Sequence, residues 1–373
     1  MKELLIQSQQ KNYPMYIGEH IFKNLGAIFS NNGIHKNTKL LIVTDEIVYK
    51  LHYKKLEAEL INCGLIYNVL VLGKGEKNKS VDVFSKVISF ALENSFDRNS
   101  AFVALGGGSI GDLTGFAAST YMRGVKFVQV PTTLLAHDSS IGGKTALNFS
   151  NHKNIIGSFY QPELIIYDIA LLQTLNQREY LAGLAEIVIH SILDGEDFYD
   201  YLCDNSQEIL NRNEKVLQEI IYKSAKTKAR YVQQDVYEKN MRAKLNLGHT
   251  FGHALESLTD YSLINHGEAI SIGCLMAAAL SEKVYNNKII PLQIIYILKR
   301  LNLIPLIRIE ILPKDLLGEM YKDKKVRNGK LTFIIPDGIG NVNIHREKID
   351  QNTVEECIGG VIKYINGLCE ISK

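Results

Sequence analysis

The stretch Ala101-Phe-Val-Ala-Leu-Gly-Gly-Gly-Ser-Ile-Gly-Asp-Leu-Thr-Gly115 decides the fold class of this chain. It opens with an apolar run typical of a buried strand, and helical spacing of apolar residues follows its glycines. Between them, Gly106–Gly111 satisfies the pattern G-x-G-x-x-G. A loop without side chains lets its backbone approach a pyrophosphate, and the helix N-terminus supplies free N–H groups. A tight glycine turn without a ligand is the alternative explanation of so short a pattern.

Short apolar runs alternate with amphipathic stretches on both sides of this loop. The expected strands are Leu40–Val43, Ile66–Leu72, Ala101–Leu105, Lys126–Val130 and Leu164–Ile166. The expected helices between them are Glu46–Asn62, Ser80–Glu93 and Ser109–Ser119. Such alternation predicts a parallel sheet that is covered by helices on both faces.

From about Leu175 the sequence changes to helical periodicity. The expected helices are Arg178–Leu202, Ser206–Gln233, Leu245–Leu258, Glu268–Val284, Pro291–Leu301 and Thr353–Ile365, and a hairpin is expected from Lys330–Ile335 and Gly340–Ile344. A chain of 373 residues exceeds the usual size of a single hydrophobic core. We therefore expect an α/β domain over residues 1–178 and a mostly helical domain over residues 179–373.

The composition excludes several classes of protein. A formal net charge of +2 gives no reason to expect nucleic acid or an anionic membrane as a partner, so a substrate anion has to meet local basic residues. The five cysteines show no C-x-x-C spacing, which favours reduced thiols over a disulfide framework. The start of the chain lacks the apolar core of a secretory signal, and no apolar run is long enough to span a bilayer. These patterns predict a cytoplasmic protein.

A group of histidines in the second half of the chain points to a metal. His249 and His253 are four residues apart and share a helix face, as paired metal ligands do, and His266 follows closely. Glu186 is a carboxylate in an apolar helical stretch, where it requires a cation nearby. Each histidine alone is as often a hydrogen-bonded side chain as a ligand. Together they favour a divalent ion with open coordination positions.

Two further features indicate anionic ligands. The segment Asp138-Ser-Ser-Ile-Gly-Gly-Lys-Thr-Ala-Leu-Asn148 does not have Walker A spacing, but its one lysine, Lys144, lies in a glycine-rich turn. Most lysines lie on solvated helix faces, so this position favours a binding role. Asp45 ends an earlier strand, where it is expected to reach a ribose hydroxyl, to cap the following helix, or to do both.

Several ordered blocks of the chain together resemble one known family. The blocks Gly106–Gly115, Val130–Leu135, Asp138–Asn148, Leu245–Ala254 and His266–Glu268 closely resemble the 3-dehydroquinate synthase family. The match extends from Thr44-Asp45 to Asp323-Lys-Lys325, which is most of the chain. The resemblance implies an α/β fold class, with an N-terminal Rossmann-like parallel-sheet domain followed by a mostly α-helical domain. It also implies a homodimer.

The resemblance further implies a phosphorus–oxygen lyase of the shikimate pathway of aromatic amino acid biosynthesis. Members of the family convert 3-deoxy-D-arabino-heptulosonate 7-phosphate, a small phosphorylated sugar acid, to 3-dehydroquinate and phosphate. Transient oxidation by NAD, phosphate elimination, re-reduction and aldol closure follow in that order. A bound Zn²⁺ or Co²⁺ ion polarises the hydroxyl that is oxidised.

The resemblance assigns roles to individual residues. The implied metal ligands are Glu186, His249 and His266, whereas His253 is implied to be an active-site histidine. The implied NAD-contacting positions are Asp45, Glu76, Lys79, Gly107, Gly108, Asp112, Thr132, Thr133, Thr174 and Leu175. The implied substrate-site positions are Asp138, Lys144, Lys153, Asn154, Lys228, Glu238, Arg242, Asn246 and Lys325, and Lys144 and Lys153 are also assigned to the cofactor. Arg123 matches an arginine that reaches the phosphate site of the neighbouring subunit. We assign the substrate phosphate to Arg123, Lys144, Asn154 and Lys325, and its carboxylate to Lys228 and Arg242.

One position departs from the family pattern. The family usually has a lysine three residues after the metal-binding glutamate, and this chain has Ile189 there. An alkyl side chain removes a hydrogen-bond donor, so another cation compensates, the helix shifts its register, or activity is reduced.

Three alternatives remain open. Other sugar-phosphate cyclases act on substrates without this carboxylate, although Lys228, Arg242 and Asn246 favour the dehydroquinate reaction. Iron-dependent alcohol dehydrogenases share the glycine loop and a helical second domain, but they are not expected to carry the Asp138–Asn148 segment. An impaired homologue that binds NAD and metal without turnover would be consistent with Ile189, although the clustered polar groups indicate a working site.

Overall fold

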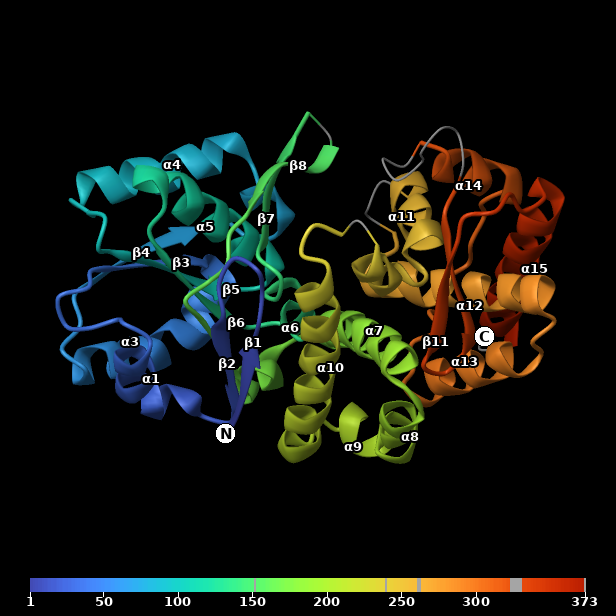
Figure 1. Ribbon diagram of the computed structural model, residues 1–373, viewed down its shortest axis with the longest axis horizontal. Helices are drawn as coiled ribbons and strands as arrows, with labels where there is room; N and C mark the ends of the chain where they lie inside the picture. The colour runs from blue at the N-terminus through green and yellow to red at the C-terminus, as the bar shows by residue number, and fades with distance from the viewer. Residues whose placement is uncertain (151, 239, 260–262, 323–330, 372–373) are drawn as a thin grey trace. The chain divides into compact units, whose positions relative to one another are not determined.

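The computed structural model describes residues 1–150, 152–238, 240–259, 263–322 and 331–371 (Figure 1). It consists of two compact units. Unit 1 contains Met1–Asn176 and Leu217–Val236, and unit 2 contains Gln177–Val216 and Tyr237–Lys373. These units differ from the predicted division at residue 178. The main difference is the segment Leu217–Val236, which lies after residue 178 but belongs to unit 1. The domain boundary near residue 178 stays a prediction.

A seven-stranded sheet forms the centre of unit 1, in the order β1-β2-β9-β6-β5-β3-β4. Its strands are β1 (Lys2–Ile6), β2 (Tyr13–Gly18), β3 (Leu40–Asp45), β4 (Tyr67–Leu72), β5 (Ala101–Gly106), β6 (Lys126–Pro131) and β9 (Leu164–Asp168). All neighbouring strands are parallel apart from β1 and β2. The predicted parallel sheet is confirmed. The antiparallel edge was not predicted, because β1 mixes charged and apolar residues and buries only one of them.

Helices cover both faces of this sheet. The helical segments of this part of unit 1 are η1 (Ile21–Asn24), α1 (Leu25–Asn31), α2 (Glu46–Val48), η2 (Tyr49–Tyr53), α3 (Lys54–Asn62), η3 (Glu76–Asn78), α4 (Val81–Glu93), α5 (Gly108–Thr120), η4 (Tyr121–Arg123), α6 (Ala136–Ser139) and η5 (Ile169–Thr174). The helix expected over Glu46–Asn62 is interrupted by a π-helical turn, η2. A separate hairpin, β7 (Lys144–Phe149) with β8 (His152–Phe159), was not predicted from its small polar residues.

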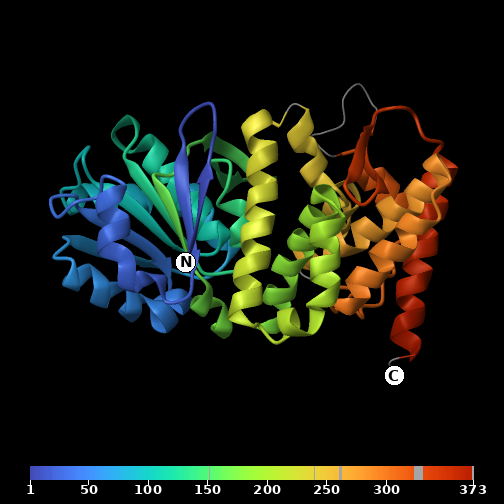
Figure 2. The same cartoon turned by 60° about the horizontal axis from the view of Figure 1, so that its bottom comes forward.

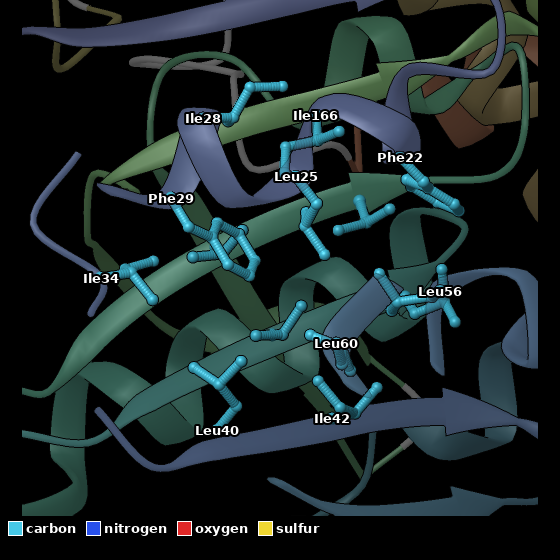
Figure 3. Close-up of a cluster of buried hydrophobic side chains, with 14 of the residues drawn as sticks. Phe22, Leu25, Ile28, Phe29, Ile34, Leu40, Ile42, Leu56, Leu60 and Ile166 are labelled. Carbon is cyan, nitrogen blue, oxygen red and sulfur yellow. The ribbon is translucent and has the colours of Figure 1, made fainter. Parts of the chain in front are cut away.

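The β3 strand shows why the apolar runs are continuous. Leu40 and Ile42 lie in one buried cluster with residues of α1 and α3, and Figure 3 shows these side chains meeting on that face. Leu41 and Val43 lie in a second cluster, with residues of α4 and α5. Successive side chains of a strand point to opposite faces, so a sheet covered on both sides buries every position. The core thus holds the carboxyl ends of β3, β5 and β6 in place.

Unit 2 is mostly helical. Its elements are α7 (Gln177–Asp194), α8 (Glu196–Asp204), α9 (Ser206–Leu210), η6 (Met241–Asn246), α11 (His249–Leu258), α12 (His266–Tyr285), α13 (Ile289–Arg300), α14 (Pro313–Met320), the hairpin β10 (Phe333–Gly338) with β11 (Asn341–His345), and α15 (Gln351–Ile371). Helix α10 (Glu214–Gln234) starts in unit 2 and belongs to unit 1 from Leu217 onwards. Within unit 2, α12 contacts α7, α11, α13 and α15 (Figures 1 and 2).

Glycines and turns set helix ends that differ from the expected ones. The helix expected over Arg178–Leu202 divides into α7 and α8 at Gly195, which has a φ of 139°. The helix expected to start at Leu245 starts only at His249, because Gly248 has a φ of 78°. The stretch expected over Ser206–Gln233 likewise divides into α9 and α10. The late hairpin is confirmed for the described residues, and Lys330 lies outside them. Among the described helices, none has the length and apolar character that crossing a membrane requires.

Candidate functional site

The glycine loop lies at the carboxyl end of β5, an interior strand that lies between β3 and β6 in the sheet. A Cβ on Gly106 would lie 2.7 Å from Cβ of Ile110, and a Cβ on Gly107 would lie 3.0 Å from Cγ2 of Thr133. Helix α5 begins directly after this turn, at Gly108. The loop therefore needs glycine for close contact, and it presents a helix N-terminus at the sheet edge, where an anion is stabilised.

Polar residues surround this loop at the ends of the neighbouring strands. Asp45 ends β3, and its Oδ1 accepts hydrogen bonds from the backbone N–H groups of Ile47 and Val48 at 2.9 and 3.0 Å. The capping role of Asp45 is thus observed. The buried hydroxyls of Thr44 and Thr132 have no hydrogen-bond partner among the described residues. Orphaned hydroxyls at the carboxyl ends of parallel strands fit a polar ligand that would approach this edge.

Lys79 is a buried lysine at the centre of a polar cluster in unit 1. Its Nζ donates to Asp112 Oδ2 at 2.6 Å and to Oδ1 of Asn154, and it lies 3.6 Å from Glu76. Asn148 joins the same cluster by donating to Glu76 Oε1 at 2.9 Å. Burial raises the pKa of the Asp112 carboxyl, and the charge of Lys79 only partly opposes this. The structure therefore brings Glu76, Lys79 and Asp112, which the resemblance assigned to NAD, together with Asn154, which it assigned to the substrate site.

A second ion pair in unit 1 joins α6 to α10. Lys228 Nζ lies 2.7 Å from Asp138 Oδ2 and also donates to the backbone oxygen of Asp138 at 2.6 Å. Lys228 is 7% exposed, so its ammonium is held against the protein by this pair. The charge of Lys228 also acts on Asp112, which links this pair to the Lys79 cluster.

The other expected residues of unit 1 lie on its loops and hairpin. Lys144 begins β7, and Lys153 lies in β8 beside Asn154. Thr133 is the second residue after β6, Thr174 ends η5, and Leu175 follows it as the C-cap. Arg123 is exposed in η4, on a different connection from the hairpin, and has a φ of 68°.

In unit 2 a carboxylate and two imidazoles converge. Glu186 Oε1 lies 3.3 Å from His249 Nε2 and 3.2 Å from His266 Nε2. Glu186 comes from α7 and is 4% exposed, and the two histidines begin α11 and α12. All three ligand atoms lie within 4.8 Å of one another. The predicted trio is therefore brought together by three different helices.

In both histidines the hydrogen-bond partner of Nδ1 fixes the role of Nε2, the ring nitrogen on the side of Glu186. His249 Nδ1 lies 3.1 Å from the backbone oxygen of Leu247, and His266 Nδ1 lies 3.3 Å from Glu256 Oε2. Because these oxygens only accept, each Nδ1 donates its proton to them, and the Nε2 of each ring, on the side of Glu186, is left as the nitrogen that can bind a metal ion. Three electron-rich atoms that meet in a buried place require a cation. This donor set fits Zn²⁺ or Co²⁺ with open positions.

The pKa of His266 also shows that its surroundings favour a positive charge. Burial alone would lower the pKa of this imidazole, but hydrogen bonds and charges from Glu186 and Glu256 outweigh burial and raise its pKa to about 10. Two carboxylates thus flank one ring. A divalent ion would supply the positive charge that this arrangement calls for.

Geometry alone does not separate His253 from the ligands. Its ring centroid lies 5.3 Å from that of His249 and 6.1 Å from that of His266. The group His253, Glu256 and His266 also has ligand atoms within 4.8 Å of one another. Both groups contain a buried carboxylate, Glu186 or Glu256, so burial does not separate them either.

The remaining expected residues of unit 2 surround η6. Arg242 is 2% exposed, and Asn246 Nδ2 donates to Glu238 Oε1 at 2.6 Å. Ile189 is 1% exposed on α7, one turn beyond Glu186. Lys325 lies outside the described residues.

Glu256 is the residue of this group that reasoning from sequence missed. It lies three residues after His253 and seven after His249, and both spacings return to one face of a helix. That spacing was a usable signal, because a metal-binding histidine usually donates its other ring N–H to a carboxylate or carbonyl.

Comparisons with known proteins identify relatives over almost the whole chain. Residues 69–182 match the family model described as 3-dehydroquinate synthase N-terminal, and residues 183–326 match the one described as 3-dehydroquinate synthase C-terminal. The 3-dehydroquinate synthase of Desulforamulus reducens is 39% identical over 350 residues, which cover 93% of this chain and 97% of the relative.

Two solved structures share the fold. A 2-deoxy-scyllo-inosose synthase, complexed with carbaglucose-6-phosphate, NAD⁺ and Co²⁺, has a TM-score of 0.85 at 24% identity and covers 96% of this chain and 99% of its own. The 2-epi-5-epi-valiolone synthase of Streptomyces hygroscopicus subsp. jinggangensis 5008, with NAD⁺ and Zn²⁺ bound, has a TM-score of 0.86 at 23% identity with the same coverage. The predicted combination of a Rossmann-like sheet unit and a helical unit is confirmed.

Proposed function

This chain belongs to the 3-dehydroquinate synthase family, and from that premise we propose how its own residues carry out the reaction. The protein is a phosphorus–oxygen lyase of the shikimate pathway. It converts 3-deoxy-D-arabino-heptulosonate 7-phosphate to 3-dehydroquinate and phosphate. The observation that carries the proposal is the convergence of Glu186 Oε1 with Nε2 of His249 and of His266.

The metal is assigned to these three residues. Glu186, His249 and His266 would hold Zn²⁺ or Co²⁺, and Glu256 would keep the proton of His266 on Nδ1. When bound, the ion polarises a substrate hydroxyl and so makes its proton easier to remove. His253 lies beside two of the ligands, where its ring is suited to accept or return that proton.

NAD is assigned to the carboxyl edge of the sheet in unit 1. When bound, it takes up a hydride from the substrate and later returns it. Gly107, Gly108 and the N-terminus of α5 would bind its pyrophosphate. Asp45 would reach a ribose hydroxyl while it caps α2. The other assigned contacts are Glu76, Lys79, Asp112, Thr132, Thr133, Lys144, Lys153, Thr174 and Leu175.

The substrate anions are assigned to basic residues. Lys228 and Arg242 would bind the carboxylate, and both side chains are buried, which strengthens a charge-assisted hydrogen bond. The phosphate is assigned to Arg123, Lys144, Asn154 and Lys325, with Arg123 serving the neighbouring subunit of a homodimer. The remaining substrate-site residues are Asp138, Lys153, Glu238, Asn246 and His253. Cytoplasmic location is proposed from the reduced-thiol pattern of the cysteines.

A direct assay tests this function. The purified protein is incubated with the heptulosonate phosphate, NAD and Zn²⁺, and phosphate release and the cyclic product are followed. Glucose 6-phosphate, a sugar phosphate without a carboxylate, serves as the control substrate. Turnover of the first and not of the second supports the proposal. Turnover of the control alone would indicate another cyclase, and binding of NAD and metal without any turnover would refute the proposed activity.

A further inference from the structure

A fully buried hydrogen bond joins α6 to α10 beside the Lys228–Asp138 ion pair. His137 and Ser224 are both 0% exposed. His137 Nδ1 lies 2.6 Å from the backbone oxygen of Leu134, and its Nε2 lies 2.7 Å from Ser224 Oγ. The carbonyl oxygen can only accept, so Nδ1 carries the proton. In the neutral ring, Nε2 then accepts the proton of the Ser224 hydroxyl.

This bond and the ion pair are adjacent on both elements. Asp138 follows His137 directly, and Lys228 lies four residues after Ser224, on the same face of α10. Two neighbouring residues of α6 therefore hold two residues of α10 that are one helical turn apart. One contact is a fully buried hydrogen bond, and the other is an ion pair at 2.7 Å with Lys228 7% exposed.

The two contacts differ in whether a substrate or salt ions can compete with them. If Lys228 binds a substrate carboxylate, its ammonium has to share or exchange its bonds to Asp138, so the ion pair cannot by itself hold α10 in register. A lysine side chain is also long and flexible, so its reach depends on where the helix backbone lies. The His137–Ser224 bond is fully buried, so substrate and salt ions have no access to compete for it.

We propose that the His137–Ser224 hydrogen bond is a positioning contact, which fixes α10 so that the Lys228 ammonium lies where the substrate carboxylate binds. The proposal rests on the proposed function, because it assigns the carboxylate to Lys228. His137 and Ser224 themselves touch no substrate. They act through Lys228 and Asp138.

The test is a pair of variants and their double variant. Ser224→Ala removes the hydroxyl, and His137→Asn keeps a donor for the Leu134 oxygen but removes the acceptor for Ser224. Each single variant is expected to raise KM for the heptulosonate phosphate by about tenfold with kcat changed less than about threefold, the effect of one lost buried hydrogen bond. The double variant is expected to be no worse than either single one, because all three lose the same bond.

Salt and a matched control separate positioning from simple loss of stability. Without the buried bond, the position of Lys228 depends more on its ion pair with Asp138, so KM of Ser224→Ala is expected to rise more steeply between 50 and 500 mM salt than KM of the wild type, by about threefold. Ser281→Ala in unit 2 also removes a fully buried hydroxyl, which bonds to the oxygen of Pro336, and it should leave KM unchanged. Ser224→Thr keeps the hydroxyl and should restore KM toward the wild-type value.

An unchanged KM in Ser224→Ala and His137→Asn, with a stability loss like that of Ser281→Ala, would overturn the positioning role. If Ser224→Ala does not fold, His137→Asn and Ser224→Thr decide in the same way. The wild type in the same assay reports on the proposed function itself. A wild type without turnover refutes that function, whereas a working wild type with unaffected variants refutes only this inference.

Discussion

At the scale of single residues, the division of labour among the histidines of unit 2 is open to direct measurement. His249→Ala removes a ligand whose Nε2 faces Glu186 at 3.3 Å, and it is expected to lower metal affinity at least 100-fold. His253→Ala is expected to keep one metal ion per chain and to lose most of the activity, about 100-fold or more for a general acid–base group. Metal content by atomic emission and a cobalt titration give both answers. Loss of metal from His253→Ala would favour the group His253, Glu256 and His266 instead.

Ile189 makes a second prediction at this scale. The side chain is 1% exposed, so Ile189→Lys places an ammonium among packed side chains, which costs about 3 kcal/mol of unfolding free energy. We expect no gain in kcat/KM, because the surroundings of Ile189 are built for an alkyl group. Urea unfolding and steady-state kinetics measure the two effects, and Ile189→Met, a swap of similar volume, should cost less than about 1.5 kcal/mol. A large gain in rate would instead show that the native site is handicapped by this residue.

At the scale of elements, the close approach of α11 and α12 depends on glycine. A Cβ on Gly273 would lie 2.0 Å from the backbone oxygen of Gly248, the residue before His249. Gly273→Ala is therefore expected to cost about 3 kcal/mol or more and to weaken metal binding, because the helices that carry two ligands have to separate. Gly318→Ala on α14 is the matched control, since a Cβ there has no atom within 4 Å. It should gain about 0.5 to 1 kcal/mol. Equal stability of the two variants would contradict this account.

The π-helical turn η2 carries a pH-dependent contribution to stability. His52 is 3% exposed, and burial, with a smaller effect of Lys55, lowers the pKa of its ring to about 4. Its Nε2 bonds to Thr174 Oγ1 at 2.8 Å, and the same hydroxyl donates to the Leu171 oxygen at 3.0 Å. The unfolded chain takes up this proton near pH 6.5 and the folded chain only near pH 4. Stability therefore falls as the pH drops through that window, by up to about 3 kcal/mol.

His52→Gln tests this contribution. Glutamine keeps an N–H donor for Thr174 and does not titrate. Between pH 7 and pH 4, urea unfolding should show that this variant loses about 2 to 3 kcal/mol less than the wild type. An equal loss of unfolding free energy in both proteins would mean that other groups determine the stability between pH 7 and pH 4.

At the scale of the whole molecule, the two proposed cofactors belong to different units. Every residue assigned to NAD lies in unit 1, and all three metal ligands lie in unit 2. NAD at about 100 times its Kd is expected to stabilise unit 1 against opening by up to about 2.7 kcal/mol. Chelation of the metal is expected to speed exchange in α7, α11 and α12. Hydrogen exchange followed by mass spectrometry checks both. Faster exchange in β3 and β5 after chelation would contradict the assignment.

Much of this architecture was predictable, for a physical reason. Strands buried on both faces are uninterrupted apolar runs, as at Leu40–Val43, so the parallel sheet was recognised from the sequence. The hairpins β1–β2 and β7–β8 were not, because they mix charged or small polar residues with apolar ones. The break at Gly195 and the start of α11 depend on positive φ angles. Glycine permits such angles, but the presence of a glycine in the sequence does not show that its φ is positive.

The candidate site was likewise predictable only in part. His249 and His253 share a helix, so their proximity follows from spacing alone. Glu186 and His266 come from other helices. The sequence suggested that they share a metal with the histidine pair, but the choice of ligands among these residues came from the resemblance. The contacts of Glu256 with His266 and of Ser224 with His137 depend on which helices pack together. Such long-range packing cannot be predicted from the periodicity of the sequence.

The return of Leu217–Val236 to unit 1 has a consequence for synthesis on the ribosome. The first 176 residues leave the exit tunnel about 60 residues before the segment that completes their unit. At usual elongation rates this interval lasts roughly 3 to 12 s. During that time His137 lacks the Ser224 hydroxyl, and the surface that later receives α10 is uncovered. The nascent chain therefore passes through a stage in which a chaperone can bind that surface, and the stage ends only when Val236 emerges.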